Sequence, residues 1–374
     1  MEVLSNFHAC FNMDKQRINW IDYAKGISML LVIIGHTTWD LTGIWNTSFV
    51  YGFHLVMFFL LSGYTSRPKT LTREFINQRF KRLMIPYFVT CAAILFMDIY
   101  NAKTLYNDLS ILNISKIAGK DLLRIFFASG GFTSFGSIDI GTRIGAIWFL
   151  PALFFATLMF QMVISLTMDS DVHAGFISAM IAIGGLLSAR FIWFPFSIQS
   201  AALAVPFIWM GYFIRKENLL DRLKWYHFIV AQIILLYGIY AGYCDIGFVG
   251  ASISDPLLSI PVGLSGCLLI YLLTNFCKGK CLLYIGRESM TILCTHLFIL
   301  ETFWDYIQRW LISFHLSGNS LVWARCLLNI LLSIFFAVIT KWIIKVYHYV
   351  CNKLITHTHT HTHTFAQRME DASL

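Results

Sequence analysis

Three ionisable residues lie in or at the edge of the first long apolar run of the chain, namely Asp22, Lys25 and His36. On one α-helix Lys25 and His36 differ by roughly 20° in azimuth and by about 16 Å along the axis. Asp22 lies roughly 40° from the same line. Because charges inside hydrocarbon are costly, such a stripe is expected to face protein or water and to be functional. The structural alternative pairs Asp22 with Lys25 at the membrane surface and leaves His36 to end the helix.

Two further polar features follow. Arg79 and Arg82 precede an apolar run, and their spacing of three places both on one helical face. Guanidinium forks suit phosphate oxygens. His54 begins an aromatic-rich segment that ends near Ser62. The alternatives are that the arginines are ordinary positively charged anchors on the cytoplasmic side and that His54 only fills a bent span.

The composition is that of a membrane protein. Hydrophobic residues make up 57% of the chain and charged residues 13%, and the mean hydropathy is +0.66. A soluble domain carries roughly 25% charged residues. A membrane helix needs roughly 17 to 25 apolar residues. The sequence therefore predicts an all-α, polytopic bundle of about ten membrane helices, with approximate cores at residues 21–39, 48–66, 83–100, 145–167, 174–193, 199–215, 226–244, 256–276, 283–301 and 323–347.

The lysine and arginine residues orient this bundle. With a cytoplasmic N-terminus most of them fall on the inner side, whereas the predicted outer loops 40–47 and 245–255 carry none. Ten spans then put both termini in the cytoplasm of a multi-pass protein of the cell (inner or plasma) membrane. The net charge of +8 is explained in this way, so membrane lipids and not nucleic acid are the expected surroundings. The nine cysteines include no C-x-x-C pair and are expected to be mostly small buried hydrophobes.

Residues 1–350 are predicted to form one membrane domain that includes an extracytoplasmic loop at 101–144. This loop is expected to contain a helix over 116–128 and then a Gly/Ser-rich stretch, and to cover the outer mouth of a site. Residues 351–374 are predicted to be a low-complexity cytoplasmic tail in which His alternates with Thr. Alternating His can hold a divalent ion, but a solvated tail without a role is preferred, and no metal is expected.

In their order and spacing these motifs resemble the integral-membrane acyltransferase 3 family, which includes O-acetyltransferases of surface polysaccharides. Lys25-x10-His36 matches the family's basic residue and histidine on the first helix, with Lys where Arg is common, and Arg79-x-x-Arg82 matches its Arg-x-x-Arg. The segment 147–153, with Trp148-Phe-Leu, resembles the entry to the fourth span. The segment 285–296 resembles a late Gly-x-x-Ser…His segment. The resemblance covers roughly residues 17 to 350.

The resemblance implies an acyl-coenzyme A donor, here taken as acetyl-CoA, and a hydroxyl of a cell-surface or lipid-linked glycan as acceptor. Transfer from a thioester needs a base near the hydroxyl and an anchor for the donor. His36 is the expected general base. Lys25, Arg79 and Arg82 are expected to bind the phosphates, although Lys25 is a point charge and not a fork. Asp22 is assigned to the catalytic set, where it orients Lys25 or shapes the donor entrance.

Four residues are predicted to bind the acceptor, and each has a structural alternative. Glu288 and His296 lie eight residues apart on roughly the same helical face, or else they pair with backbone or water. His54 polarises the acceptor or fills a bent span, and Trp148 stacks on a sugar or anchors the membrane interface. Ser62 has no evident partner base, so helix packing is preferred to a role as acyl carrier.

Two other classes of protein remain as alternatives. A transporter or flippase for a small anion or a lipid-linked sugar also places ionisable residues in spans. It predicts an internal repeat and broken helices, which the sequence does not reveal. A membrane sensor or assembly factor without catalysis would not depend on His36.

Overall fold

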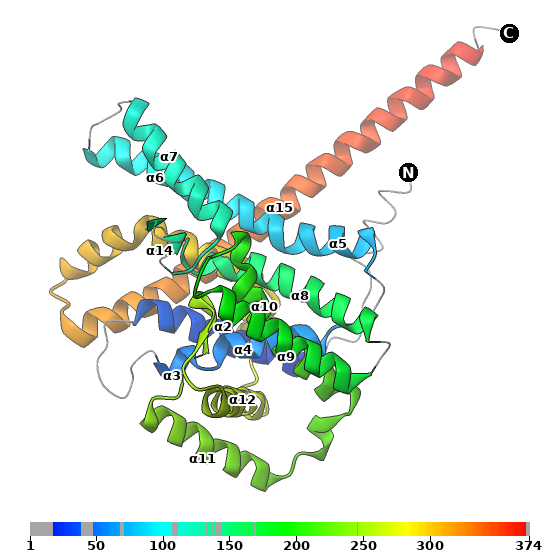
Figure 1. Cartoon of the computed structure of the whole chain (residues 1–374). Helices are drawn as coiled ribbons and strands as arrows, with labels where there is room; N and C mark the ends of the chain where they lie inside the picture. Colours follow the sequence, from blue (N-terminus) through cyan, green and yellow to red (C-terminus); the bar gives the residue numbers. More distant parts are fainter. Residues whose placement is uncertain are drawn as a thin grey trace.

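The computed structural model describes residues 18–38, 48–67, 71–106, 111–131, 134–135, 138–139, 144–167, 170–244 and 246–371. The chain is a bundle of helices, and its few strands form two short antiparallel pairs, β1 with β2 and β3 with β4 (Figure 1). The elements are α2 (Asn19–Thr37), α3 (Ser48–Tyr51), α4 (His54–Tyr64), α5 (Arg73–Arg79), the π-helical turn η1 (Phe80–Met84), α6 (Ile85–Tyr106), α7 (Ile111–Phe127), β1 (Ser134–Phe135), β2 (Ile138–Asp139), η2 (Gly145–Trp148), α8 (Phe149–Leu166), α9 (Asp171–Ser188), η3 (Pro195–Ser197), α10 (Ile198–Lys216), η4 (Leu219–Arg222), α11 (Trp225–Ala241), β3 (Ile246–Gly247), η5 (Phe248–Gly250), β4 (Ser252–Ile253), α12 (Pro256–Leu273), α13 (Lys280–Arg287), α14 (Ser289–Ile312) and α15 (Gly318–Asp371).

Helices suited to crossing a membrane dominate the bundle. Within the described ranges 6 helical segments are long and apolar enough to cross, and each overlaps a predicted span; they are Arg73–Asn101, Gly145–Leu166, Asp171–Ser188, Pro195–Lys216, Pro256–Leu273 and Gly318–Tyr347. Two shorter apolar helices, His54–Tyr64 and Trp225–Ala241, lie in two more predicted spans. The predicted all-α, multi-pass membrane fold is confirmed. The number of ten spans and their orientation stay predictions.

Two of the predicted spans are interrupted. The predicted span 48–66 is divided into α3 and α4 by a turn at Gly52-Phe53, immediately before His54. The predicted span 283–301 is divided between α13 and α14 at Glu288, whose φ of −102° lies outside the helical range. Glu288 and His296 therefore do not belong to one continuous helix as the sequence predicted.

The helix α2 occupies the centre of the bundle, where it contacts α4, α12, α13, α14 and α15 (Figure 1). Its approach to α13 depends on Gly26 and Gly286. A Cβ added at Gly286 would collide with the carbonyl oxygen of Asp22, and one added at Gly26 would lie 2.5 Å from the carbonyl oxygen of Leu282. Small residues of this kind let two membrane helices meet backbone to backbone. The contact brings Asp22 next to the C-terminal end of α13.

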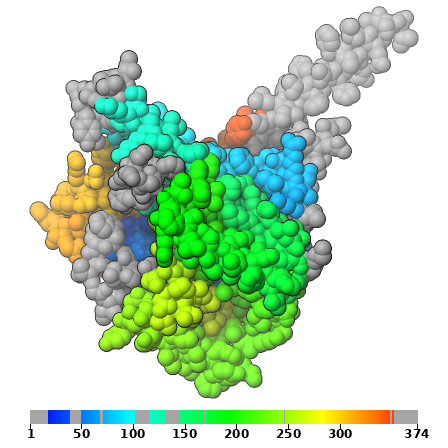
Figure 2. All heavy atoms as spheres, viewed as in Figure 1, coloured from blue at the N-terminus to red at the C-terminus, as the bar shows by residue number. Residues whose placement is uncertain are grey.

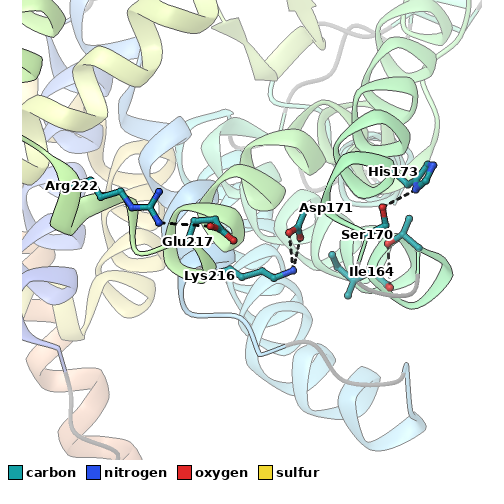
Figure 3. A network of polar contacts seen from close by, with 8 residues as sticks. Ile164, Ser170, Asp171, His173, Lys216, Glu217 and Arg222 are labelled. Carbon is teal, nitrogen blue, oxygen red and sulfur yellow. Dashed lines mark hydrogen bonds and ion pairs between the residues drawn. The ribbon is translucent and has the colours of Figure 1, made fainter.

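An ion pair joins the ends of α9 and α10. Figure 3 shows Lys216, at the end of α10, directed at the carboxylate of Asp171 on the first residue of α9, with Nζ–O distances of 2.9 and 2.8 Å. A carboxylate at a helix N-terminus also interacts favourably with the helix dipole. Because partly exposed pairs contribute only roughly 0.2–1 kcal/mol, the packing of Gly185 against Ala202 along these helices matters more for their contact.

The predicted loop at 101–144 contains the helix that was expected over 116–128. It is α7, which starts five residues before the predicted 116 and ends at Phe127. The hydroxyl of Tyr87 on α6 donates to the carbonyl of Ile125 at 2.6 Å, and the backbone N–H of Ile144 donates to the carbonyl of Ser129 at 2.8 Å. The first contact fixes the segment against α6, and the second joins two parts of the segment to each other. Parts of the predicted Gly/Ser-rich stretch, at 132–133 and 136–137, lie outside the described residues.

Candidate active site

One cavity joins most of the site residues predicted from the sequence. Its volume is about 210 Å³. Residues from six segments of the chain line it, and they include Asp22, Lys25 and His36 of α2, His54 of α4, Arg79 and Arg82 before the start of α6, Trp148 of η2, and Arg287 at the end of α13. The stripe predicted along α2 therefore faces a space inside the protein and not lipid. The passage connects the imidazole of His36 to the two arginines.

The imidazole of His36 lies in a cluster of aromatic rings near the end of α2. The hydroxyl of Tyr51 is 3.4 Å from its Nδ1. The ring centroid of His296 on α14 is 5.8 Å from that of His36, and the ring of His54 is 5.4 Å from that of Tyr51. The helices α2, α4 and α14 and the short α3 thus meet around the imidazole of His36.

The neighbouring rings of His54 and His296 are fixed by their own helices. Their Nδ1 atoms contact the carbonyl oxygens of Val50, at 2.5 Å, and of Leu293, at 2.9 Å. Because a carbonyl oxygen only accepts, each Nδ1 carries the proton, which leaves the other ring nitrogen of a neutral imidazole as an acceptor. His54 lines the cavity. His296 is completely buried behind it, and its Nε2 has no hydrogen-bond partner in the described part of the chain.

The two arginines lie at the start of a π-helical turn and within it. Arg79 is the last residue of α5, and Arg82 lies within η1. The sequence placed both on one face of a regular α-helix, whereas the π turn adds a residue to the helical repeat, a distortion that is frequent at functional sites. Both side chains nevertheless line the first cavity. The Arg79 guanidinium also lies 5.3 Å from the centroid of the Phe75 ring.

Asp22 lies at the end of the cavity where the cations gather. Its Oδ2 is 3.4 Å from Nε of Arg287, and its side chain is only 11% exposed. Lys25, Arg79, Arg82 and Arg287 all line the same cavity, so its walls carry four cationic side chains and the one carboxylate of Asp22. The expected role of Asp22 in orienting Lys25 or shaping the donor entrance stays a prediction, and the partner that the structure gives to its carboxylate is Arg287.

A second cavity, of about 700 Å³, lies on the other side of His36. His36, Tyr51, Ala146, Trp148 and Val249 line both cavities, so the two meet at these side chains. The remaining wall comes largely from α14. It carries the aromatic residues Trp304 and Tyr306, the acidic residues Glu301 and Asp305, and the basic residue Arg309. Figure 2 shows blue atoms from the first described part of the chain in a hollow beside the gold atoms of α14.

The indole of Trp148 separates the two cavities. It is 2% exposed, which does not fit the alternative of an anchor at the membrane interface. A Cβ added at Gly130 would collide with this ring. Gly130 also lines the second cavity, so the described start of the Gly/Ser-rich stretch contributes to its wall, and the predicted covering of an outer mouth by this loop stays a prediction.

Glu288 lies away from both cavities. Its carboxylate binds Nζ of Lys341 at 2.8 Å and accepts from the hydroxyl of Thr291 at 3.3 Å. It lines neither of the two cavities. The break between α13 and α14 turns this side chain toward α15, and the contacts favour the structural alternative for this residue.

Comparison with known proteins decides the family. A family model described as an acyltransferase domain matches residues 18–344. The chain belongs to the acyltransferase 3 family. The nodulation protein NolL of Mesorhizobium japonicum is 28% identical over 162 residues, which is 39% of this chain and 42% of that protein. The match thus spans less than half of that relative's length. No solved structure matches the chain.

The resemblance seen in the sequence is therefore confirmed. Membership of the family, together with 6 apolar helices among the described residues, makes the chain a multi-pass membrane protein of the acyltransferase 3 family. Within the described residues of the acyltransferase there is no group of three or more His, Cys, Asp or Glu that could hold a metal ion.

Three residues of the acyltransferase site were missed by the sequence analysis. Tyr51 and Arg287 were overlooked although each is close in sequence to a motif residue. Arg325 of α15 is 3% exposed, donates to the carbonyl of Thr37 at 3.1 Å, and lies 4.2 Å from the ring centroid of Trp304. The sequence did indicate Arg325, because an arginine inside the predicted apolar span 323–347 requires a partner.

Proposed function

We propose that this membrane acyltransferase is an O-acetyltransferase that uses acetyl-CoA and a hydroxyl of a cell-surface or lipid-linked glycan. The observation that carries the proposal is the position of His36 at the junction of two cavities. One cavity leads to a cluster of cations, and the other is walled by aromatic and acidic side chains. Two substrates can therefore approach one imidazole from opposite sides.

The first cavity suits an acyl-coenzyme A. The coenzyme carries anionic phosphates, and guanidinium groups bind phosphate oxygens in pairs. Arg79, Arg82 and Arg287 supply such groups, and Lys25 adds a fourth positive charge. About 16 Å of α2 separates Lys25 from His36, which is comparable to the reach of the pantetheine arm. The thioester would then lie beside His36 while the phosphates stay among the cations.

His36 would act as the general base. When Nδ1–H donates to the Tyr51 oxygen, the lone pair of Nε2 is available to take the proton of the acceptor hydroxyl. The hydroxyl oxygen attacks the thioester carbonyl, the ester bond forms, and the carbon–sulfur bond breaks. The proton on His36 passes to the leaving coenzyme A thiolate, which restores the neutral imidazole.

The second cavity suits a sugar. Indole rings such as those of Trp148 and Trp304 can stack on the apolar face of a pyranose, and the carboxylates of Glu301 and Asp305 can accept hydrogen bonds from its hydroxyls. If the cations face the cytoplasm, as the distribution of Lys and Arg predicts, the acetyl group crosses the membrane while the coenzyme does not.

The test is transfer of labelled acetyl from acetyl-CoA by the purified protein with His36 replaced by alanine. We expect a fall of roughly 10²–10⁴-fold, the usual contribution of a general base, with donor binding retained. The matched control is His173→Ala, since His173 is exposed on α9 and lines neither cavity. Near-normal transfer by a folded His36→Ala protein would refute the base assignment. Mass spectrometry of surface glycans with and without the gene tests the acceptor class by a shift of one acetyl group.

A further inference from the structure

An apolar groove lies between α14 and α15, which form a hairpin at one edge of the bundle (Figure 1). Its volume is about 310 Å³. Ile299, Phe303, Ile307 and Trp310 line it from α14, and Leu332 and Phe336 face them from α15. These side chains carry almost no polar atoms. A water-soluble oligosaccharide would find almost no hydrogen-bond partners there, whereas a hydrocarbon chain needs none and would gain apolar contact.

The groove adjoins the second cavity. Tyr306 lines both of them. On the same helix, Asp305 and Arg309 line the second cavity, while Ile307 and Trp310 line the groove. One face of α14 is therefore apolar and its neighbouring face is polar, with Tyr306 at the boundary. The polar face leads on to His36, which lines the same cavity.

The order of these surfaces specifies a ligand. From the groove to the cavity they are apolar side chains, Tyr306 at the boundary, and a cavity whose walls carry one cation at Arg309, aromatic and acidic side chains, and His36. A long-chain lipid phosphate that carries a sugar has the same order of parts. We propose that the acceptor is a glycan linked through phosphate to a long hydrocarbon chain, and that this chain lies between α14 and α15 while the sugar enters the second cavity from the membrane.

This inference rests on the proposed function for the identity of the reaction, but its binding test does not depend on catalysis. The probe is a polyprenyl phosphate with a photoreactive diazirine, added to the full-length protein in nanodiscs and mapped by peptide mass spectrometry. We expect crosslinks to the segments 299–310 and 332–336. Unlabelled polyprenyl phosphate should compete for them, and an equal excess of ordinary phospholipid should not.

Substitutions in the hairpin sharpen this test. Leu332→Trp fills the groove and should lower labelling roughly tenfold, which is the effect of removing about two methylene groups of apolar contact. Leu331→Trp is the matched control, because Leu331 is the adjacent residue, is 56% exposed and does not line the groove. Arg309→Gln should weaken labelling by the polyprenyl phosphate but not by the uncharged polyprenol.

Several outcomes would overturn the inference. Equal competition by phospholipid would make the groove an ordinary lipid site, and equal effects of Leu331→Trp and Leu332→Trp would remove the groove from binding. Labelled acetyl that appears only in the aqueous glycan fraction of membranes, and never in the solvent-soluble lipid fraction, would exclude a lipid-linked acceptor. Failure of the proposed function would look different, since normal transfer by the His36→Ala protein leaves the labelling pattern intact.

Discussion

Replacing Arg325 with methionine tests whether this arginine, which contacts the wall of the second cavity, also holds the proposed base His36 in position. The guanidinium of Arg325 binds the carbonyl of Thr37, the residue after His36, and lies over the ring of Trp304 in the cavity wall. Methionine fills similar space without charge or donors. The substitution therefore removes the hydrogen bond to the C-terminal end of α2 and the cation–π contact with Trp304.

The size of the effect follows from these two contacts. A hydrogen bond from a charged group contributes about 1.5–3 kcal/mol and a desolvated cation–π contact about 0.5–2 kcal/mol, so their combined loss is about 2–5 kcal/mol. Part of this loss appears as reduced stability. A displacement of the base by about 1 Å would lower kcat roughly 10²-fold. The KM for acetyl-CoA should stay unchanged, because the cations that line the donor cavity are at the other end of α2.

The assay measures kcat and KM for acetyl-CoA together with thermal unfolding of the purified protein. Arg325→Lys should recover part of kcat, since an ammonium group can still donate to the Thr37 carbonyl but cannot reproduce the planar contact with Trp304. Arg190→Met, at an exposed position after α9, is the control. An unchanged kcat, or a rise in KM for the donor with kcat intact, would refute the idea that Arg325 positions His36.

Two further predictions concern the two cavities. Replacing Arg79 and Arg82 together by glutamine should raise the KM for acetyl-CoA roughly 10–10³-fold, from the loss of one or two charged hydrogen bonds, and should leave kcat nearly intact; Arg222→Gln, which alters an exposed arginine paired with Glu217, is the control in the same steady-state assay. Gly130→Ala should force the Trp148 ring out of place and lower acceptor turnover roughly tenfold or more, by analogy with small misplacements of substrate. Gly184→Ala, where an added Cβ meets nothing within 4 Å, should not change it.

Local periodicity predicted the parts of the site that lie on one element. Lys25 and His36 share a face because eleven residues are close to three full turns, and both do line one cavity. The pairing of Arg79 with Arg82 was also predictable, although the π turn between them was not, since no residue type specifies it.

Contacts between distant elements could not be obtained in this way. The approach of His296 to His36 depends on how α14 crosses α2, and the contact of Arg325 with Thr37 depends on the position of α15. Glu288 was assigned to the acceptor on the assumption of a continuous helix. The break at this residue turns its carboxylate to Lys341, and no proline or other strong breaker in the sequence marked it.

Because the two cavities meet at His36, their arrangement also affects the permeability of the membrane to ions. Asp22 and His36, at the two ends of the first cavity, are separated by about 21 Å along α2, against a hydrocarbon thickness of about 30 Å. If the two cavities open to opposite sides of the membrane, as the predicted orientation requires, the rings of His36, Tyr51 and Trp148 form the barrier between two aqueous compartments. An enzyme that opened this barrier in every catalytic cycle would dissipate ion gradients. The bound substrates are therefore expected to close the passage between the two cavities themselves.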